Sequence, residues 1–309
     1  MKLRPLTLSA LLLLVCAAVL LVLEFRRQDR DLSPRGLLLR LPSQEEGIQV
    51  YADIQTLRRA GLLDLLAGSR ASEELDYRRF VEAVKFDYRE DLDAIYGVFD
   101  GRRSNFLLEG RISWGDIRQY SEQHGARCRS GYCSLEGRAP DRVLSFYPVS
   151  PDVLSIAIDA DMWGAELTAK PKPEPPGFWI PPQPFWVAVP GKVLADPGSL
   201  PAGAAAFASQ LKGALRMTLA AGPSGDAFQA EMRARFQNET DAAESRANLA
   251  KATETLQAFL AREKQRANPS DMSGLLVSGS FEQEGTVVVG RWPITRAFLE
   301  NLAGGNLEQ

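Results

Sequence analysis

The sequence predicts an α+β protein in which two tandem ferredoxin-like (split βαβ) domains follow an N-terminal transmembrane helix. Three observations lead to this prediction. An uncharged apolar run opens the chain, strand and helix periodicities alternate after it, and a proline-rich stretch separates two similar halves. The chain has 309 residues, of which 45% are hydrophobic and 24% charged. That composition is ordinary for globular proteins, and it leaves enough chain for two hydrophobic cores.

Residues 1–25 are expected to be a signal anchor. The run from Leu6 to Leu23 carries no charge, and as a helix it would span about 27 Å, close to the thickness of a bilayer's hydrocarbon core. Lys2 and Arg4 precede it, as in an export signal. Cleavage at the small residues around Cys16 would leave an apolar stub on the mature chain, so we expect the anchor to stay.

The orientation of the anchor follows from mixed signals. Arg26, Arg27 and Arg30 follow the apolar run and by count favour a cytoplasmic C-terminal side. The short N-terminal tail and a pair of cysteines favour export. We therefore expect a single-pass protein of the bacterial inner membrane, with the bilayer as its partner through Leu6 to Leu23 and the bulk of the chain in the periplasm.

Residues 26–46 are expected to form a tether, and residues 47–169 the first α+β domain. The alternation in 48–54 predicts a strand, and helical spacing predicts helices over 56–68, 73–84 and 114–124, the last ended by Gly125. The turn Asp100-Gly101 between apolar runs predicts a hairpin. Four further strands are expected in ARCRS, YCSLEG, RVLSFYPV and VLSIAID, with a short helix near 162–167.

Residues 170–184 are expected to link the two domains. Seven of these fifteen residues are proline, which excludes a regular helix and favours an extended polyproline II path. Phe178, Trp179, Phe185 and Trp186 would pack onto the two halves and fix their relative angle. The alternative is that this stretch is a peptide-like ligand for another domain.

Residues 185–309 repeat the order of the first half and form the second α+β domain. A strand is expected in PFWVAVP, a helix over 204–211, a hairpin in RMTLAAG and DAFQAEMRARF, a long helix over 239–267 after an Asn238 cap, a hairpin in GLLVSGSF and TVVVGRW, and a last helix over 294–302. Strand, helix, hairpin, helix, hairpin, helix in each half indicates an internal duplication.

Cys128 and Cys133 enclose a four-residue turn, and we expect them to form a structural disulfide in an oxidising compartment. The alternatives are two free thiols or a redox pair, although redox pairs usually have the CxxC spacing at a helix start.

The residue inventory excludes several functions. The net charge of −3 and pI near 5.5 argue against nucleic acid as a partner. His124, the single histidine, is expected to cap the helix that it ends, because no Ser or Cys stands in a nucleophile motif. We find no phosphate-binding loop and no Cys/His metal motif, so no catalytic residue, cofactor or metal ligand is predicted.

Two groups of carboxylates were considered as chemical sites. Asp87, Glu90 and Asp91, with Asp93 beside them, lack the spacing of a calcium loop and predict a solvated connection. Asp159 and Asp161 end a strand and could act as an acid and base pair, but they more simply end the strand and begin a helix.

The segment VYADIQTLRRAGLLDLL, with Asp53 and Leu57-Arg58, resembles the start of a class of uncharacterised bacterial single-pass exported proteins, and SFEQEGTVVVGRWPITRAFLENL resembles their ending. The resemblance implies repeated α+β units on a membrane anchor and carries over no functional residue.

The sequence therefore predicts a membrane-anchored extracytoplasmic protein without enzymatic activity, acting as a binding module or in an envelope assembly with a protein partner. The alternative is a carboxylate-dependent hydrolase of the cell envelope that uses residues such as Asp159 and Asp161.

Overall fold

The structure is a computed structural model that describes residues 31–42, 46–63, 75–137, 139, 142–175, 178–196, 209–224 and 227–303. The expected anchor, Leu6 to Leu23, lies outside these residues, so its insertion stays a prediction. Among the helices within the described ranges, none is both long and apolar enough to cross a membrane.

Helices and strands alternate along the described chain. The first half contains α2 (Pro34–Arg40), β1 (Ile48–Asp53), α3 (Ile54–Arg59), α6 (Leu75–Val84), α7 (Tyr88–Asp91), β2 (Leu92–Phe99), β3 (Ser104–Gly110), α8 (Trp114–Gln123), β4 (Arg127–Arg129), β5 (Tyr132–Glu136), β6 (Val143–Ser150), β7 (Val153–Asp159) and the 3₁₀ helix η1 (Gly164–Thr168). The second half contains β8 (Phe185–Pro190), α9 (Gly191–Leu194), β9 (Arg216–Ser224), β10 (Ala227–Arg235), α11 (Glu239–Arg262), α12 (Met272–Val277), β11 (Ser280–Glu284), β12 (Val287–Ile294) and α13 (Arg296–Ala303).

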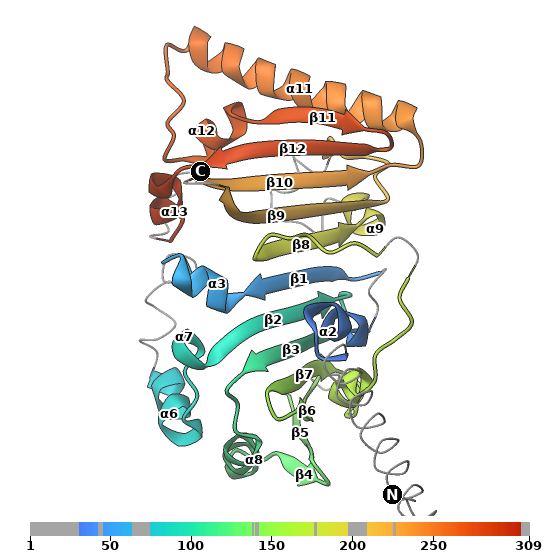
Figure 1. The fold of residues 1–309 in the computed structure, drawn as a ribbon, viewed down its shortest axis with the longest axis vertical. Helices are drawn as coiled ribbons and strands as arrows, with labels where there is room; N and C mark the ends of the chain where they lie inside the picture. The colour runs from blue at the N-terminus through green and yellow to red at the C-terminus, as the bar shows by residue number, and fades with distance from the viewer. Residues whose placement is uncertain are drawn as a thin grey trace, which may run out of the picture.

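All twelve described strands join one antiparallel sheet in the order β11-β12-β10-β9-β8-β1-β2-β3-β7-β6-β5-β4 (Figure 1). The two halves meet in the middle, where β1 pairs with β8 and Tyr51 lies opposite Trp186. Outward from β1 come β2, β3 and β7, and outward from β8 come β9, β10 and β12. This shared order is the arrangement that two copies of one unit would produce.

The α+β class is confirmed, but the ferredoxin-like strand pairing is wrong. A split βαβ unit places the strands on either side of a helix parallel to each other. Here β1 and β2 are antiparallel neighbours, with Ile48 opposite Phe99. Near the end of β1, Arg58 of α3 donates to the carbonyl of Leu92 at 2.6 Å, a contact that holds the start of β2 beside α3 and fits this antiparallel pairing. The sheet continues across the expected boundary between residues 169 and 185, and the division into domains stays a prediction.

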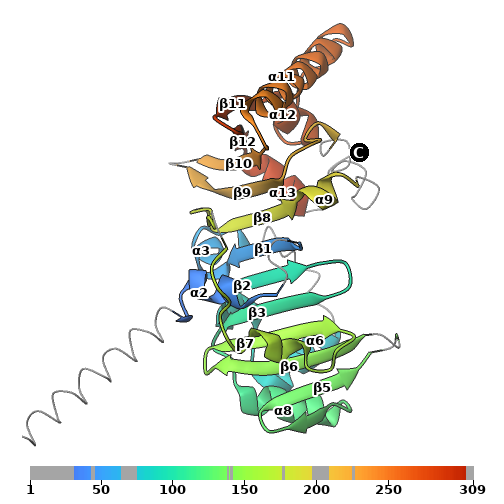
Figure 2. The same cartoon turned by 90° about the vertical axis from the view of Figure 1, so that its right-hand side faces the viewer.

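The two faces of the sheet carry different cores. On β1, Ile48 and Ala52 point to the face covered by α3, α6, α8 and α11, while Tyr51 points to the face covered by α2. Leu37, Leu38 and Leu41 in and just after α2 are at most 1% exposed. Figure 2 shows this short helix beside the middle strands of the sheet.

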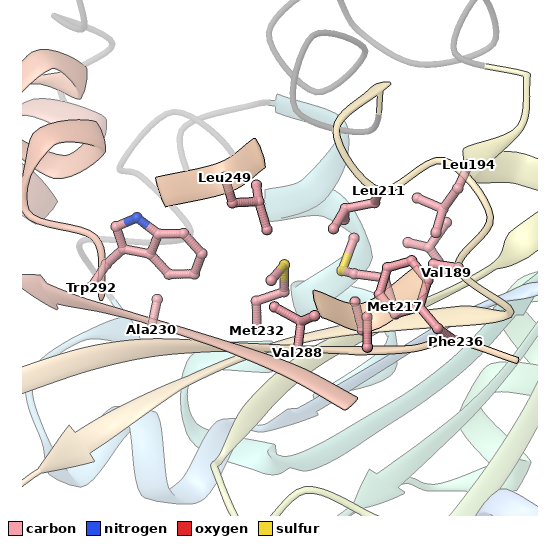
Figure 3. Close-up of a cluster of buried hydrophobic side chains, with 13 residues drawn as sticks. Val189, Leu194, Leu211, Met217, Ala230, Met232, Phe236, Leu249, Val288 and Trp292 are labelled. Atoms are coloured by element: carbon pink, nitrogen blue, oxygen red, sulfur yellow. The ribbon is translucent and has the colours of Figure 1, made fainter. Parts of the chain in front are cut away.

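The core of the second half lies between α11 and the strands β9, β10 and β12. Met232 of β10 is fully buried and lies between Leu249 of α11 and Val288 of β12 (Figure 3). The alternation predicted for this strand is confirmed, because Met232, Ala234 and Phe236 are at most 2% exposed. The predicted Asn238 cap is also confirmed, since its side-chain oxygen accepts from the N–H of Asp241 at 2.9 Å.

Two segments of the second half differ from expectation. Residues 272–277 form helix α12, not a strand, because the Asp271 carboxylate accepts from the N–H groups of Ser273 and Gly274 and caps a helix there. Helix α11 ends at Arg262, five residues before the predicted end. Most of the helix expected over 204–211 lies outside the described residues.

The described part of the proline-rich stretch has no regular secondary structure and lies against α2. Lys172 N–H donates to the Leu39 carbonyl at 2.8 Å, and Phe178 packs on the core under α2. Trp186 is 2% exposed, whereas Trp179 is 50% exposed with the Arg233 guanidinium over its ring. Phe178, Phe185 and Trp186 therefore pack on the cores as predicted, whereas Trp179 is half exposed and meets the second half through Arg233.

Candidate functional site

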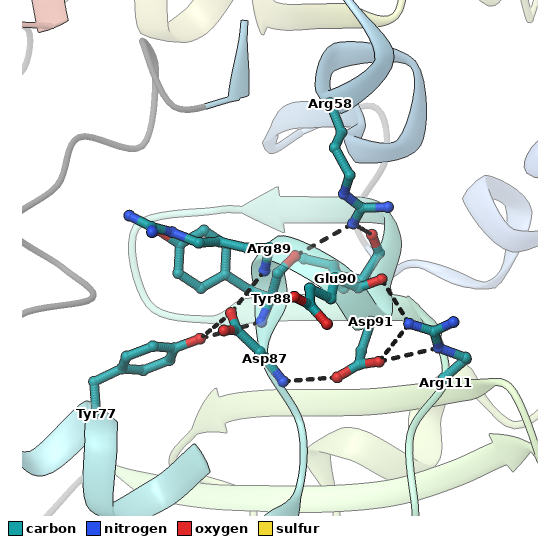
Figure 4. Close-up of polar contacts among 9 residues, drawn as sticks. Arg58, Tyr77, Asp87, Tyr88, Arg89, Glu90, Asp91 and Arg111 are labelled. Atoms are coloured by element: carbon teal, nitrogen blue, oxygen red, sulfur yellow. Dashed lines mark hydrogen bonds and ion pairs between the residues drawn. The ribbon is translucent and has the colours of Figure 1, made fainter. Parts of the chain in front are cut away.

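The acidic cluster predicted as a solvated connection forms the corner between α6, α7 and β3 (Figure 4). Asp87 caps α7 and accepts from the Tyr77 hydroxyl at 2.9 Å. Asp91 accepts from the N–H of Asp87 at 2.8 Å and from Arg111 at 2.7 Å. These carboxylates hold elements together and leave no open pair for acid and base chemistry.

The corner perturbs two ionisable groups. Desolvation, followed by the hydrogen bond to Asp87, raises the pKa of Tyr77 to about 12, against a lowering contribution from the Tyr88 N–H. For Asp91, partial burial favours the neutral form, but the Asp87 N–H and the Arg111 guanidinium outweigh it, so its pKa lies below the ordinary value. Burial therefore dominates the shift of the Tyr77 pKa, and hydrogen bonds and the nearby guanidinium dominate that of the Asp91 pKa.

The second pair of candidate carboxylates, Asp159 and Asp161, lies between β7 and η1. Asp159 is 5% exposed, faces Arg103 at 3.3 Å, and accepts from the N–H of Asp161. Asp161 in turn accepts from the N–H of Trp163 at 2.9 Å. Both side chains therefore end the strand and start the helix, as the simpler of the two sequence interpretations predicts.

Cys128 and Cys133 form the predicted disulfide, joining β4 to β5. The two residues lie directly opposite each other in the ladder, so the bond fixes the register of the sheet's last hairpin. Cys133 is fully buried and pairs on its other side with Phe146 of β6.

A pocket of about 250 Å³ lies between helices α6 and α8 and the strands β3, β5, β6 and β7. The strands supply its floor through alternate residues, and the helices supply its walls. Its thirteen lining residues include ten apolar side chains and no Asp, Glu, Lys or Arg. The lining residues are Phe80, Phe86, Leu108, Ile112, Ile117, Tyr120, Ser121, His124, Leu135, Leu144, Phe146, Leu154 and Ile156.

Aromatic side chains connect the helices over this pocket. The Phe80 ring of α6 meets the Tyr120 ring of α8 edge-on at 5.3 Å, and Tyr120 lies 4.1 Å from the ring of His124. On the other side of Phe80, Tyr77 lies at 6.5 Å and leads into the acidic corner. Val84 is the buried residue of α6, so this helix is held largely by its aromatic contacts and by the corner.

The polar groups of the pocket lie at the C-terminal end of α8. Ser121 is 7% exposed, and His124 follows it three residues later as the C-cap. The Nδ1 atom of His124 lies 2.8 Å from the Tyr120 carbonyl, so His124 caps the helix as predicted. Ser121 was not among the residues predicted from the sequence. The signal was present in the spacing of Ile117, Tyr120, Ser121 and His124, which places all four on one stripe of the helix.

A different polar pair lies on the opposite face, under α2. The Tyr96 hydroxyl, fully buried, donates to Glu109 at 2.8 Å. Desolvation raises the pKa of Glu109, the Tyr96 hydrogen bond opposes that effect, and Asp93 and Asp53 reinforce it. Desolvation also raises the pKa of Tyr96 strongly. Within the described ranges, no group of three or more His, Cys, Asp or Glu side chains is placed to hold a metal ion.

The comparisons with known proteins add no functional information. No known family matches the sequence, and no curated protein matches it either. Among solved structures, crystal form I of TP0453 superposes with a TM-score of 0.46 at 11% sequence identity and covers 87% of this chain and 95% of TP0453. Crystal form IV gives a TM-score of 0.45 at 10% identity, again over 87% and 95% of the two chains. A likeness at this level carries no argument about this chain's function.

Proposed function

We propose that the chain is a membrane-anchored, extracytoplasmic binding protein without enzymatic activity, which holds an apolar small molecule in the pocket between α6 and α8. The pocket's lining carries this proposal. A concave site with apolar walls and a few polar groups at one end is the usual form of a small-molecule site. Its 250 Å³ corresponds to about eight water-sized atoms at roughly 30 Å³ each.

The proposed location, at a membrane and outside the cytoplasm, rests on other observations. The uncharged run from Leu6 to Leu23 supports a membrane anchor, and the Cys128–Cys133 disulfide supports an oxidising compartment such as the periplasm. An anchor would hold the pocket near a bilayer and near other envelope proteins. A partner protein in an envelope assembly remains part of the proposal, although no surface among the described residues favours one.

The test fills the pocket from its floor and compares the result with a change on the opposite face. Leu144 of β6 lines the pocket, and its neighbour Val143 points to the other side of the sheet; both are half-buried. Leu144→Trp would occupy the pocket, whereas Val143→Trp adds a comparable bulk outside it. The protein is the full chain in lipid nanodiscs, and the ligand is heptan-1-ol, which has about the pocket's capacity in non-hydrogen atoms.

Binding is followed by hydrogen–deuterium exchange of the α6 and α8 amides as the alcohol is titrated, with empty nanodiscs as the blank. The natural chain and Val143→Trp are expected to gain saturable protection in both helices. Leu144→Trp is expected to be protected already without ligand and to gain nothing further. Equal protection of all three proteins, or none in the natural chain, would refute the proposal. If Leu144→Trp does not fold, Leu135→Phe fills the same pocket from β5 with a smaller change.

A further inference from the structure

The hydroxyl of Ser121 is an unpartnered polar group in the wall of an apolar pocket. The residue is 7% exposed and lines the pocket, yet among the described residues its Oγ makes no hydrogen bond, not even to the helix turn before it. The Oγ atom is accessible to water in the pocket, so a ligand that displaces this water leaves the hydroxyl unpaired unless it brings a hydrogen-bonding group of its own. The position therefore calls for a hydrogen-bonding group on whatever fills the pocket.

The tautomer of His124 defines what that group must be. A carbonyl oxygen only accepts, so the 2.8 Å contact between Nδ1 and the Tyr120 carbonyl requires the proton to be on Nδ1. In the neutral ring Nε2 is then an acceptor. Ser121 and His124 are three residues apart on α8, which places them on the same side of the helix. Of the two lining residues Ser121 is buried and His124 is exposed, so the polar end of the pocket offers a buried hydroxyl and, beside it, a solvent-accessible ring with one unprotonated nitrogen.

The C-terminal end of α8 adds a negative electrostatic potential at this end of the pocket, which also favours a hydrogen-bond donor. Both residues lie in the last turn of α8, where the aligned peptide dipoles give a helix end a partial negative charge of roughly half an electron. Backbone N–H groups of residues 124–126 bond the last carbonyls and offset part of this charge. The pocket has no Lys or Arg in its lining to offset that field. A carboxylate or phosphate at this end would meet a negative potential and lose its hydration without a cation, whereas an O–H donor would meet acceptors.

We propose that the pocket selects a neutral apolar molecule that carries a hydroxyl group, such as an aliphatic or isoprenoid alcohol, whose O–H donates to Ser121 or His124 at the end of α8. This inference rests on the proposed function and specifies the ligand class of the same site. It excludes ionised fatty acids as the preferred ligand, although their chains would suit the pocket walls.

The experiment compares three ligands of nearly equal size on the full chain in nanodiscs, by the same amide-exchange titration. Heptan-1-ol has a donor and an acceptor. Its isomer 1-methoxyhexane keeps the oxygen but lacks the donor, and hexanoate is an ionised acceptor at pH 7. Two variants accompany the natural chain. Ser121→Ala removes the hydroxyl, and His124→Phe removes the ring nitrogens while keeping an aromatic ring against Tyr120.

Heptan-1-ol is expected to bind the natural chain roughly five-fold more tightly than 1-methoxyhexane, which is the effect of one neutral hydrogen bond, and hexanoate more weakly than both. One of the two variants, Ser121→Ala or His124→Phe, removes the side chain that accepts the hydrogen bond from the alcohol. In that variant the ratio of the affinities for alcohol and ether is expected to fall to about one, while binding of the ether changes less than roughly two-fold. Equal affinities for alcohol and ether, tighter binding of hexanoate, or an unchanged preference in both variants would overturn the inference and leave the proposed function standing. Failure of all three ligands to bind the natural chain would overturn both.

Discussion

The hydrogen bond from the Tyr96 hydroxyl to the Glu109 carboxylate is expected to stabilise the folded sheet, and its contribution can be measured. Changing Tyr96 to Phe removes that donor and keeps the ring. A hydrogen bond to a charged group contributes about 1.5–3 kcal/mol to stability. Glu109 is only half-buried, so solvent replaces part of the lost bond, and we expect the low end, about 1.5 kcal/mol at pH 7. The unfolding midpoint should fall by roughly 3–6 °C.

The stability lost in Tyr96→Phe should depend on pH and should be larger at neutral than at acidic pH. The pKa of Glu109 is raised in the folded protein, chiefly by desolvation, so this group favours folding below its unfolded pKa of about 4.3 and loses that contribution as pH rises through the folded pKa. The Tyr96 hydroxyl limits the loss because it stabilises the carboxylate. Without it the pKa of Glu109 rises further, and the variant's deficit should grow between pH 4 and pH 7.

The measurement is thermal unfolding followed by circular dichroism at pH 4 and pH 7. Tyr51→Phe is the matched control, because its ring lies 5.1 Å from that of Tyr96 on the same face and its hydroxyl has no hydrogen-bond partner within the described ranges. The control should change stability by less than about 0.5 kcal/mol at either pH. The reasoning is refuted if Tyr96→Phe costs no more than Tyr51→Phe, or if its cost grows on acidification.

Three further predictions concern other parts of the fold. Replacing Cys128 and Cys133 by Ser should cost about 2 kcal/mol, measured by urea unfolding, and an equal urea midpoint for the reduced natural chain and the variant is the control. Asp91→Asn should destabilise by about 1 kcal/mol at pH 7, since Arg111 is largely exposed and its attraction is screened. Because folding lowers the pKa of Asp91, the difference should begin to shrink as pH falls below about 4 and disappear only below the folded pKa, and a constant difference would contradict this. Phe236→Ala should cost about 3–5 kcal/mol in the same unfolding assay, because the ring is 2% exposed, and a loss below 1 kcal/mol would show that the core around it is not packed as described.

The sequence predicts local elements better than it predicts their pairing. The strand from residue 227 to 235 follows from its strict alternation, and the Asn238 cap follows from residue chemistry. Strand order depends instead on contacts between distant residues, such as Arg58 with Leu92, which leave no periodic trace in the sequence. The order of elements was interpreted as a split βαβ unit, and this interpretation predicted the wrong strand pairing. The segment 272–277 was misread because its apolar run is too short to separate strand from helix by periodicity.

Sequence motifs could not predict the candidate site, because it too depends on contacts between distant residues. Its lining comes from two helices, four strands and two connections, and each contributes ordinary core residues. Only the packed structure reveals that they leave a space unfilled. Ser121 on the apolar stripe of α8 was the one sequence signal, since a polar residue at a core position is an exception that needs a reason. His124 was noticed and correctly assigned to the helix end, but its contact with a pocket depends on β5 and β6.

Because β1 pairs with β8, one edge of β1 stays unpaired during synthesis until β8 has been made. Phe185, the first residue of β8, is synthesised 132 residues after Asp53, the last residue of β1. At roughly 5–20 residues per second, β1 waits about 7–26 seconds for the strand that will cover its edge. During that interval its open backbone groups and the uncovered Tyr51 ring can pair with another nascent chain. A chaperone that binds during this window would therefore improve the yield of folded protein more than one that acts on the finished chain.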